Sequence, residues 1–190
     1  MRRSVLYTIA VLTLAACAPR VSPEQKAQGV AAFATVEKVF QHPRCSNCHI
    51  PGDQPLQFDT HTPHMMNVVR GPDGKGAAGL PCSTCHGDKN PPASYGPHAP
   101  PGAPHWSLPP PDRKMAWIGV PAKQLCEMLK DRSKNGDRDF AALIKHVDED
   151  QLVLWGWNPG GDRAPVSVPH AEFVAAFRTW TGAGGPCPET

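Results

Sequence analysis

The sequence predicts a mostly helical, loop-rich domain with little or no sheet. Apolar residues recur at helical spacing in a first segment and again in the C-terminal third of the chain. Between them, residues 44–111 keep neither a helical nor a strand period. The 190 residues include 23 Pro and 17 Gly, which interrupt regular backbone, so we expect short helices and Pro-rich loops in one domain.

The first helix is expected to begin at Pro23 and to end close to Pro43. Ser22 is a suitable N-cap, and Gln25, three residues later, completes a capping box. Pro is well tolerated in the first turn. The apolar residues that follow share one helical face, namely Val30, Phe33, Val36 and Phe40.

Three more helical stripes follow in the C-terminal third. The apolar segment 153–157 lies between the second and the third and is too short to classify. Gly182 is expected to close the last helix. The stripes are Leu125, Met128 and Leu129; then Phe140, Leu143, Ile144 and Val147; and finally Phe173, Phe177 and Trp180.

The N-terminus predicts export. Residues 1–16 have two arginines followed by an apolar stretch of signal-peptide length, too short to span a bilayer. Residues 14–17 read Leu-Ala-Ala-Cys and resemble the lipobox of bacterial lipoproteins, in which Cys17 would be acylated and become the first residue. We therefore expect a signal peptide over 1–16, a lipidated tether over 17–22 and one domain over 23–190, with the outer membrane slightly favoured. The alternative is ordinary cleavage nearby and a free Cys17.

The charge balance excludes an electrostatic case for nucleic-acid binding. The formal net charge is +2, but two of the 19 basic residues lie in the expected signal peptide. The mature chain then has as many basic as acidic residues and no basic stripe. No second apolar run of 18 or more residues exists that could cross a membrane.

Two pentapeptides carry the strongest chemical signal. Residues 45–49 read Cys-Ser-Asn-Cys-His and residues 82–86 read Cys-Ser-Thr-Cys-His. C-x-x-C-H is the attachment pattern of c-type haem, in which both thiols bond covalently to the porphyrin and the His binds the iron. We therefore expect two haem c groups, with His49 and His86 as proximal ligands and these thiols as attachment points: Cys45, Cys48, Cys82 and Cys85.

Two other chemistries use C-x-x-C pairs. A zinc site would take a Cys₄ or Cys₂His₂ set, but it does not require His directly after the second Cys. A thiol oxidoreductase would place one C-x-x-C beside a βαβ pattern, which this sequence lacks. In an exported chain with two adjacent Cys-His pairs, haem is the favoured interpretation.

The Pro-rich middle of the chain fits a cofactor-binding loop. Nine of the 21 residues in 91–111 are Pro, a composition that a disordered linker would share. This segment also holds Trp106 and Leu108 and follows the second Cys motif. Because two haems would supply apolar surface that so short a chain lacks, we favour a segment wrapped around cofactor.

Cys126 and Cys187 lie outside both motifs. In an oxidising compartment an even pair is most simply a disulfide, which would tie the C-terminal tail to the helix near Leu125. A thiolate ligand to iron is the alternative.

Further His residues can supply the distal iron ligands. His64 is preferred because it lies in an unpatterned segment between the motifs and can reach either haem. His146, at the border of a helical apolar stripe, is preferred for the other iron. His42 is the main competitor and His105 ranks fourth. Met65 and Met66 could replace His64 and would raise the reduction potential.

Five stretches of the chain carry a family resemblance, namely 42–45 (His-Pro-Arg-Cys), 66–74 (Met-Asn-Val-Val-Arg-Gly-Pro-Asp-Gly), 101–104 (Pro-Gly-Ala-Pro), 155–160 (Trp-Gly-Trp-Asn-Pro-Gly) and 185–188 (Gly-Pro-Cys-Pro). They resemble a family of small dihaem cytochromes identified as cytochrome subunits of isoquinoline 1-oxidoreductase, a molybdenum hydroxylase. His64 and the turn at Asp73-Gly74 lie between the two motifs. In this they resemble, more faintly, the dihaem small subunit of periplasmic nitrate reductase, and that resemblance implies two His ligands for each iron.

These observations predict an electron-transfer protein rather than an enzyme. No acid, base or nucleophile constellation is evident. The resemblance implies a redox partner protein, with a molybdenum hydroxylase as one candidate, and relay of electrons to the respiratory chain. The alternative is a redox enzyme or a gas or peroxide sensor in which one iron keeps an open position.

Overall fold

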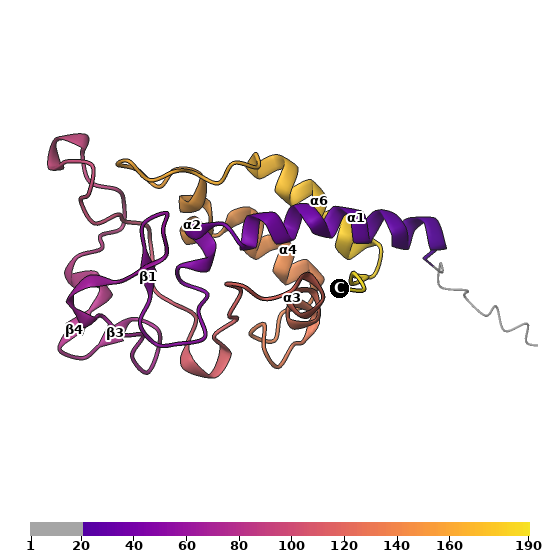
Figure 1. Cartoon of the computed structure of the whole chain (residues 1–190), viewed down its shortest axis with the longest axis horizontal. Coiled ribbons are helices and arrows are strands. Elements are labelled where there is room, and N and C mark those ends of the chain that lie inside the picture. The colour runs from indigo at the N-terminus through magenta and orange to yellow at the C-terminus, as the bar shows by residue number, and fades with distance from the viewer. Residues whose placement is uncertain (1–20) are drawn as a thin grey trace, which may run out of the picture.

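A computed structural model describes residues 21–190. Over these residues the chain forms a mostly helical, loop-rich fold with six helices and two small two-stranded sheets, as the sequence predicts. The expected signal peptide and the expected lipidation site, Cys17, lie outside the described residues. Figure 1 shows the helices gathered at one end of the molecule and the loops of the middle of the chain at the other.

Helix α1 (Pro23–Phe40) begins as the sequence predicts. The Ser22 side chain accepts a hydrogen bond from the Gln25 backbone N–H, and the Gln25 side chain accepts one from the Ser22 N–H. Together they satisfy two donors that a helix start leaves unpaired. The helix buries its apolar face, including Phe33, Val36 and Phe40.

The helical half is built around one apolar core. Helix α1 packs along α6 (His170–Gly182), with α3 (Ala122–Lys130) and α4 (Phe140–Glu149) completing the half (Figure 1). The core residues Phe33, Leu125, Phe173, Phe177 and Trp180 have at most 1% of their surface exposed. Burying one such side chain stabilises a fold by about 1.5–3 kcal/mol, so this cluster dominates the stability of the half.

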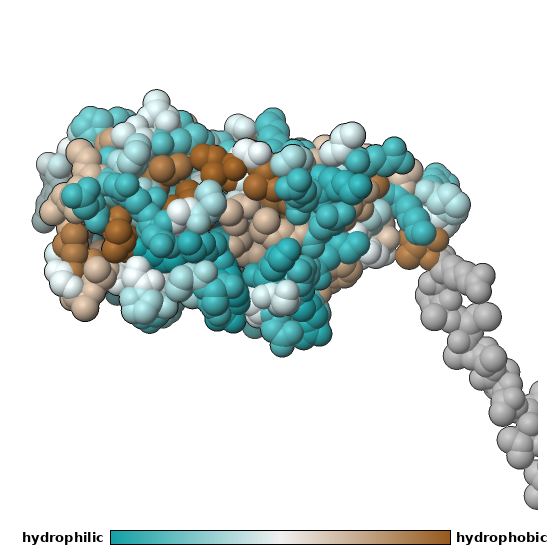
Figure 2. Space-filling model, turned by 60° about the horizontal axis from the view of Figure 1, so that its bottom comes forward, coloured by the Kyte–Doolittle hydropathy of each residue, from teal (hydrophilic) through white to brown (hydrophobic). Residues whose placement is uncertain are grey.

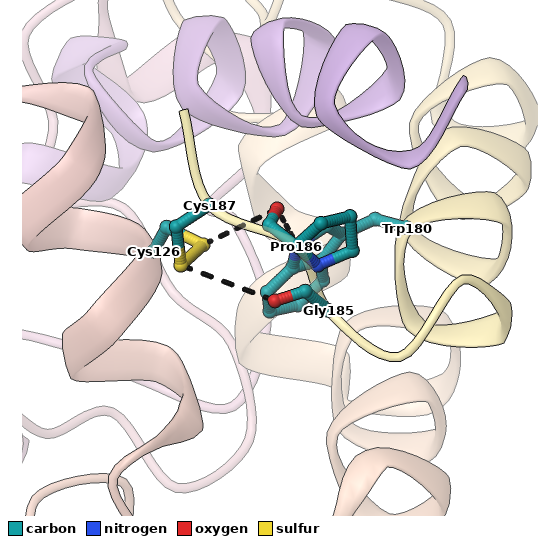
Figure 3. Close-up of a disulfide and its surroundings, with 5 residues drawn as sticks. All are labelled: Cys126, Trp180, Gly185, Pro186 and Cys187. Carbon is teal, nitrogen blue, oxygen red and sulfur yellow. Dashed lines mark hydrogen bonds between the residues drawn. A yellow bond between two sulfur atoms is a disulfide. The ribbon is translucent and has the colours of Figure 1, made fainter. Parts of the chain in front are cut away.

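A disulfide joins Cys126 of α3 to Cys187 of the C-terminal tail, which confirms that sequence prediction. Figure 3 shows the tail at this bond, beside Trp180 of α6. The Trp180 indole N–H donates to the Pro186 carbonyl at 3.0 Å. A Cβ on Gly29 of α1 would come within 2.7 Å of Pro186 Cγ, so the tail also packs tightly against α1.

The segment 153–157, which the sequence does not classify, is helical. Asp150 caps the short helix α5 (Gln151–Leu154) by accepting from the backbone N–H groups of Leu152 and Val153. A 3₁₀ turn (Trp155–Trp157) follows directly. An apolar run of this length is compatible with either a strand or a helix. Here the N-cap at Asp150 favours the helix.

The loop half contains little regular backbone. Its elements are α2 (Pro43–Ser46), the hairpin of β1 (Leu56–Gln57) with β2 (Thr62–Pro63), the hairpin of β3 (Gly76–Ala77) with β4 (Leu80–Pro81), and 3₁₀ turns. All large apolar residues that are exposed within 21–190 belong to this half: Phe58, Met65, Met66, Val69 and Tyr95. Figure 2 shows hydrophobic surface at that end, on the left.

Arg70 holds the loops together. Its side chain is fully buried and donates to the backbone carbonyls of Ile50, Gly52 and Pro109. The turn that contains Gly74 is bound to the segment around Pro109 as well, because the Leu108 N–H donates to the Gly74 carbonyl at 2.8 Å. The loop half is therefore ordered by backbone-directed hydrogen bonds rather than by an apolar core.

Within residues 21–190, no helix is both long and apolar enough to cross a bilayer.

Candidate functional site

The first C-x-x-C-H motif lies at the junction of the two halves. Helix α2 follows α1 after a short break, and the His42 side chain caps it by accepting from the Arg44 N–H at 3.2 Å. The turn continues through the motif, because the His49 N–H donates to the Cys45 carbonyl. This helical turn sets both thiols and the imidazole of the motif in one place.

A cavity of about 440 Å³ adjoins this motif. It is lined by Cys45, Cys48 and His49, and also by His146 from α4. Four of the five Trp residues of the chain line it as well: Trp106, Trp117, Trp155 and Trp157. The volume and the apolar lining are those of a typical cofactor site.

His49 and His146 each leave Nε2 without a hydrogen-bond partner among residues 21–190. His49 Nδ1 lies 2.9 Å from the Met115 carbonyl, and His146 Nδ1 lies 3.2 Å from Asp150 Oδ2. Since a carbonyl or carboxylate oxygen only accepts, Nδ1 carries a proton in both rings, and Nε2 is the nitrogen left for a metal ion. A second-shell bond of this kind is what fixes a metal-binding His.

The His49 imidazole is held neutral. Burial lowers its pKa to about 3, so it carries no charge at physiological pH. Its ring stacks on Trp117 with centroids 3.3 Å apart and planes 4° apart, and Trp117 stacks in turn on Phe40 of α1. Neutral imidazole is the form that binds metal, and the stack fixes its orientation.

The second motif lies in a 3₁₀ turn (Cys82–Thr84) that follows β4. The His86 N–H donates to the Cys82 carbonyl at 3.0 Å, and His86 Nδ1 lies 2.7 Å from the Pro101 carbonyl. As in the first motif, the ring proton is on Nδ1 and Nε2 is left as the ligand atom. The His86 ring stacks on Trp106, with centroids 4.3 Å apart and planes 5° apart.

His64 faces His86. The two ring centroids are 6.1 Å apart, and His64 Nδ1 lies 2.9 Å from the Met65 carbonyl. Two imidazoles on opposite sides of one metal ion, each bound through Nε2 at about 2 Å, have ring centroids about 6 Å apart. The separation of His64 and His86 therefore fits a shared iron.

The second site is more open than the first. Cys82 is buried, but Cys85 is exposed, and Met65 and Met66 beside His64 are 63% and 71% exposed. Met66 also has a backbone φ of 64°, a left-handed conformation that is unusual for its residue type. This segment projects the two Met side chains into solvent.

The donor groups around the first cavity also fit haem. Arg44 Nε and Trp117 Nε1 are buried, line the cavity and have no hydrogen-bond partner in the described part of the chain. A buried donor without a partner costs about 1–3 kcal/mol. The propionate oxygens of haem are acceptors, so bound haem would offer partners for both groups.

The two motifs are neighbours. Burial, and after it the nearby Cys82 thiol, raise the pKa of the Cys48 thiol to about 11. The pair of sites thus occupies one continuous region at the boundary between the helical and the loop half.

The other two His residues considered as distal iron ligands lie in different places. His42 caps α2 beside Asp59 and His61 and is not part of the cavity. His105 lines the cavity but is exposed. No three His, Cys, Asp or Glu side chains within 21–190 gather into a metal-binding group. A zinc site needs four ligands, whereas haem iron takes two protein ligands, and it is pairs of His that come together here.

Two residues of the sites were missed from sequence. Arg44 directly precedes the first motif, but a single Arg there has no sequence signature. Asn90 is the second: its side-chain oxygen accepts from Trp155 Nε1 and from the Gly102 N–H, both at 3.1 Å. Nothing local to Asn90 signals this role, because both partners are distant along the chain.

Comparisons with protein-family models, with curated proteins and with solved structures find no match to this chain.

Proposed function

We propose that this chain is a dihaem c-type cytochrome that relays electrons and is not itself an enzyme. The observation that carries the proposal is the pairing of each motif His with a second His. His49 and His146 line one cavity, and His86 and His64 have ring centroids 6.1 Å apart. All four rings have Nδ1 engaged and Nε2 available.

The assignment of residues follows from this pairing. Cys45 and Cys48 would hold one haem and Cys82 and Cys85 the other, each through two thioether bonds. His49 and His146 would bind the first iron. His86 and His64 would bind the second. When bound, each haem supplies a one-electron Fe(III)/Fe(II) couple whose potential depends on ligands, burial and hydrogen bonds.

The second candidate function is a redox enzyme or gas sensor with one open iron position. The exposure of Cys85, Met65 and Met66 around the second site favours it, because a small molecule could reach that site. Carbon monoxide separates the two functions. A relay with two six-coordinate irons should not bind it in the reduced state, and a sensor should.

We further propose that the protein works outside the cytoplasm, held to a membrane by a lipid on Cys17. Its redox partner would be a periplasmic or membrane-associated oxidoreductase, with a molybdenum hydroxylase suggested by the sequence resemblance, and the electrons would pass to the respiratory chain. Cys17→Ala should release the protein into the periplasm in soluble form. Wild-type protein that is already soluble there would contradict the anchor.

The direct test is covalent haem content. Intact mass after acid–acetone extraction should retain two haem increments in the wild type. Cys45→Ala/Cys48→Ala and Cys82→Ala/Cys85→Ala should each retain one. Cys126→Ala/Cys187→Ala is the matched control, because it removes two other cysteines, and it should keep both increments. A wild-type mass with one increment or none rejects the proposal.

A further inference from the structure

Trp106 contacts both candidate sites. One face of its indole lies on the His86 ring, with centroids 4.3 Å apart and planes 5° apart. The same side chain lines the cavity that contains His49 and His146. Trp106 also meets Trp155, another wall of that cavity, edge-to-face at 4.9 Å. It is thus a wall that the two sites share.

The position of Trp106 is fixed from both sides of its chain segment. Before it, the Pro101 carbonyl accepts from His86 Nδ1 at 2.7 Å. After it, the Leu108 N–H donates to the Gly74 carbonyl at 2.8 Å. These bonds hold the segment against the second motif and leave the indole little freedom.

Trp155, which contacts Trp106, is also held in place by hydrogen bonds. Trp155 Nε1 donates to Asn90 Oδ1, and the Asn90 amide donates to the Asn158 carbonyl at 2.8 Å. Asn90 Oδ1 also accepts from the Gly102 N–H, four residues before Trp106. The Asn90 side chain therefore bonds both to Trp155 and to the segment that carries Trp106.

We propose that Trp106 sets the plane of the His86 imidazole and is the aromatic contact through which the two sites exchange an electron. This rests on the proposed function. The exchange moves one electron from the reduced site to the oxidised one, and no proton or bond changes. An indole packed between the sites replaces a gap by a conjugated group, which favours electron tunnelling.

Trp117 supplies a matched control. It stacks on His49 much as Trp106 stacks on His86, with planes 4° apart. Its other neighbour is Phe40 of the helical core, with ring centroids 4.1 Å apart, and no ring of the second motif. The pair thus separates a general effect of an indole on a ligand His from an effect of the shared wall.

The first readout is the EPR spectrum of the oxidised protein, whose g-values report the orientation of the axial imidazoles of each iron. Trp106→Leu should shift the g-values of the His86 iron and leave those of the His49 iron unchanged. Trp117→Leu should do the reverse. Unchanged g-values of the His86 iron in Trp106→Leu would contradict the positioning role.

The second readout is the rate of internal electron exchange after laser-flash reduction, in variants whose potentials are titrated in parallel. Trp106→Leu should slow the exchange by about tenfold or more, the change expected for a barrier raised by about 1.4 kcal/mol. Trp117→Leu, which removes an indole from the first site only, should slow the exchange by less than Trp106→Leu, and Trp106→Phe, which keeps an aromatic ring, should fall between Trp106→Leu and the wild type.

Each outcome decides a separate point. A wild-type rate in both Trp106 variants would overturn the shared contact while leaving the dihaem assignment intact. If Trp106→Leu fails to retain two haems by mass, Trp106→Phe decides alone, and an unchanged rate and spectrum there would overturn the inference. A wild type without two haems rejects the proposed function instead.

Discussion

The two C-x-x-C-H motifs have the same residue pattern but lie in different surroundings. The first faces a cavity walled by helices of the core, with Phe173 and Phe177 of α6 among its lining. The second lies among loops, next to the exposed side chains of Cys85, Met65 and Met66. A motif therefore specifies covalent chemistry, while the packing around it specifies access and stability.

The comparison also separates two ways of building a site. In the helical half, apolar burial positions His146, because its helix is anchored by Leu143 and Val147 in the core. In the loop half, hydrogen bonds to backbone groups position His64 and His86. We expect the first site to be coupled to global unfolding and the second to respond locally.

The largest difference between the two sites is expected when the cysteines proposed to attach the haems are removed. Cys45→Ala/Cys48→Ala should lower the free energy of unfolding by at least about 3–5 kcal/mol, because an unfilled cavity would remain beside the core. Thermal unfolding should shift down by about 10 °C. Cys82→Ala/Cys85→Ala should cost only about a third of that, measured by circular dichroism at 222 nm. Equal losses in the two variants would remove the proposed difference.

The disulfide should act on the helical half alone. Cys126→Ala/Cys187→Ala opens a loop with a sequence separation of 61 residues and should cost about 3–4 kcal/mol. Near-ultraviolet dichroism should report loosening around Trp180, whose indole bonds to the tail. The absorption of the second haem should stay as in the wild type. Arg178→Ala is the control, since its exposed pair with Asp148 is worth less than about 1 kcal/mol.

Removing each proposed distal His should show how easily a small molecule reaches each of the two sites. His146→Ala and His64→Ala should each leave one reduced iron that binds carbon monoxide. Binding should be faster in His64→Ala, because that site is the more exposed of the two. His42→Ala should keep both irons six-coordinate, since His42 caps α2 instead. Wild-type spectra in both distal variants would reject this ligand assignment.

The smallest effect is expected at the methionines beside His64. Met65→Ala and Met66→Ala should each change stability by less than about 0.5 kcal/mol, because both side chains lie largely in solvent. The oxidised wild type should lack the weak far-red band that a Met–iron bond produces. A band that disappears in one of these variants would show that Met, and not His64, is the ligand.

Sequence patterns predicted the helical half well because its signals are local. The capping box at Ser22 and Gln25 and the stripe from Phe33 to Phe40 identify α1 within one segment. The helix of Leu143 and Val147 was identified in the same way. Such patterns succeed because the helical period itself brings the apolar side chains to one face.

The loop half was predicted only by composition. Its Pro residues excluded long helices and strands, but nothing in the sequence placed Arg70 under the carbonyls of Ile50 and Pro109. Likewise, the sequence nominated His64 and His146 without deciding which motif each one meets. Bonds between residues far apart along the chain depend on the path of the intervening backbone, and no local period reports that path.

By itself, the sequence determined the fold class, the haem-attachment signature, the first helix and the pairing of Cys126 with Cys187, because spacing or elimination decides each of these. Only the tertiary structure decided that His146 shares the cavity of His49, that His64 faces His86, and that Trp106 lies against both sites. The reason is physical. Spacing along the chain determines which residues are neighbours within a few helical turns, whereas core packing and backbone hydrogen bonds determine contacts between residues that are tens of positions apart.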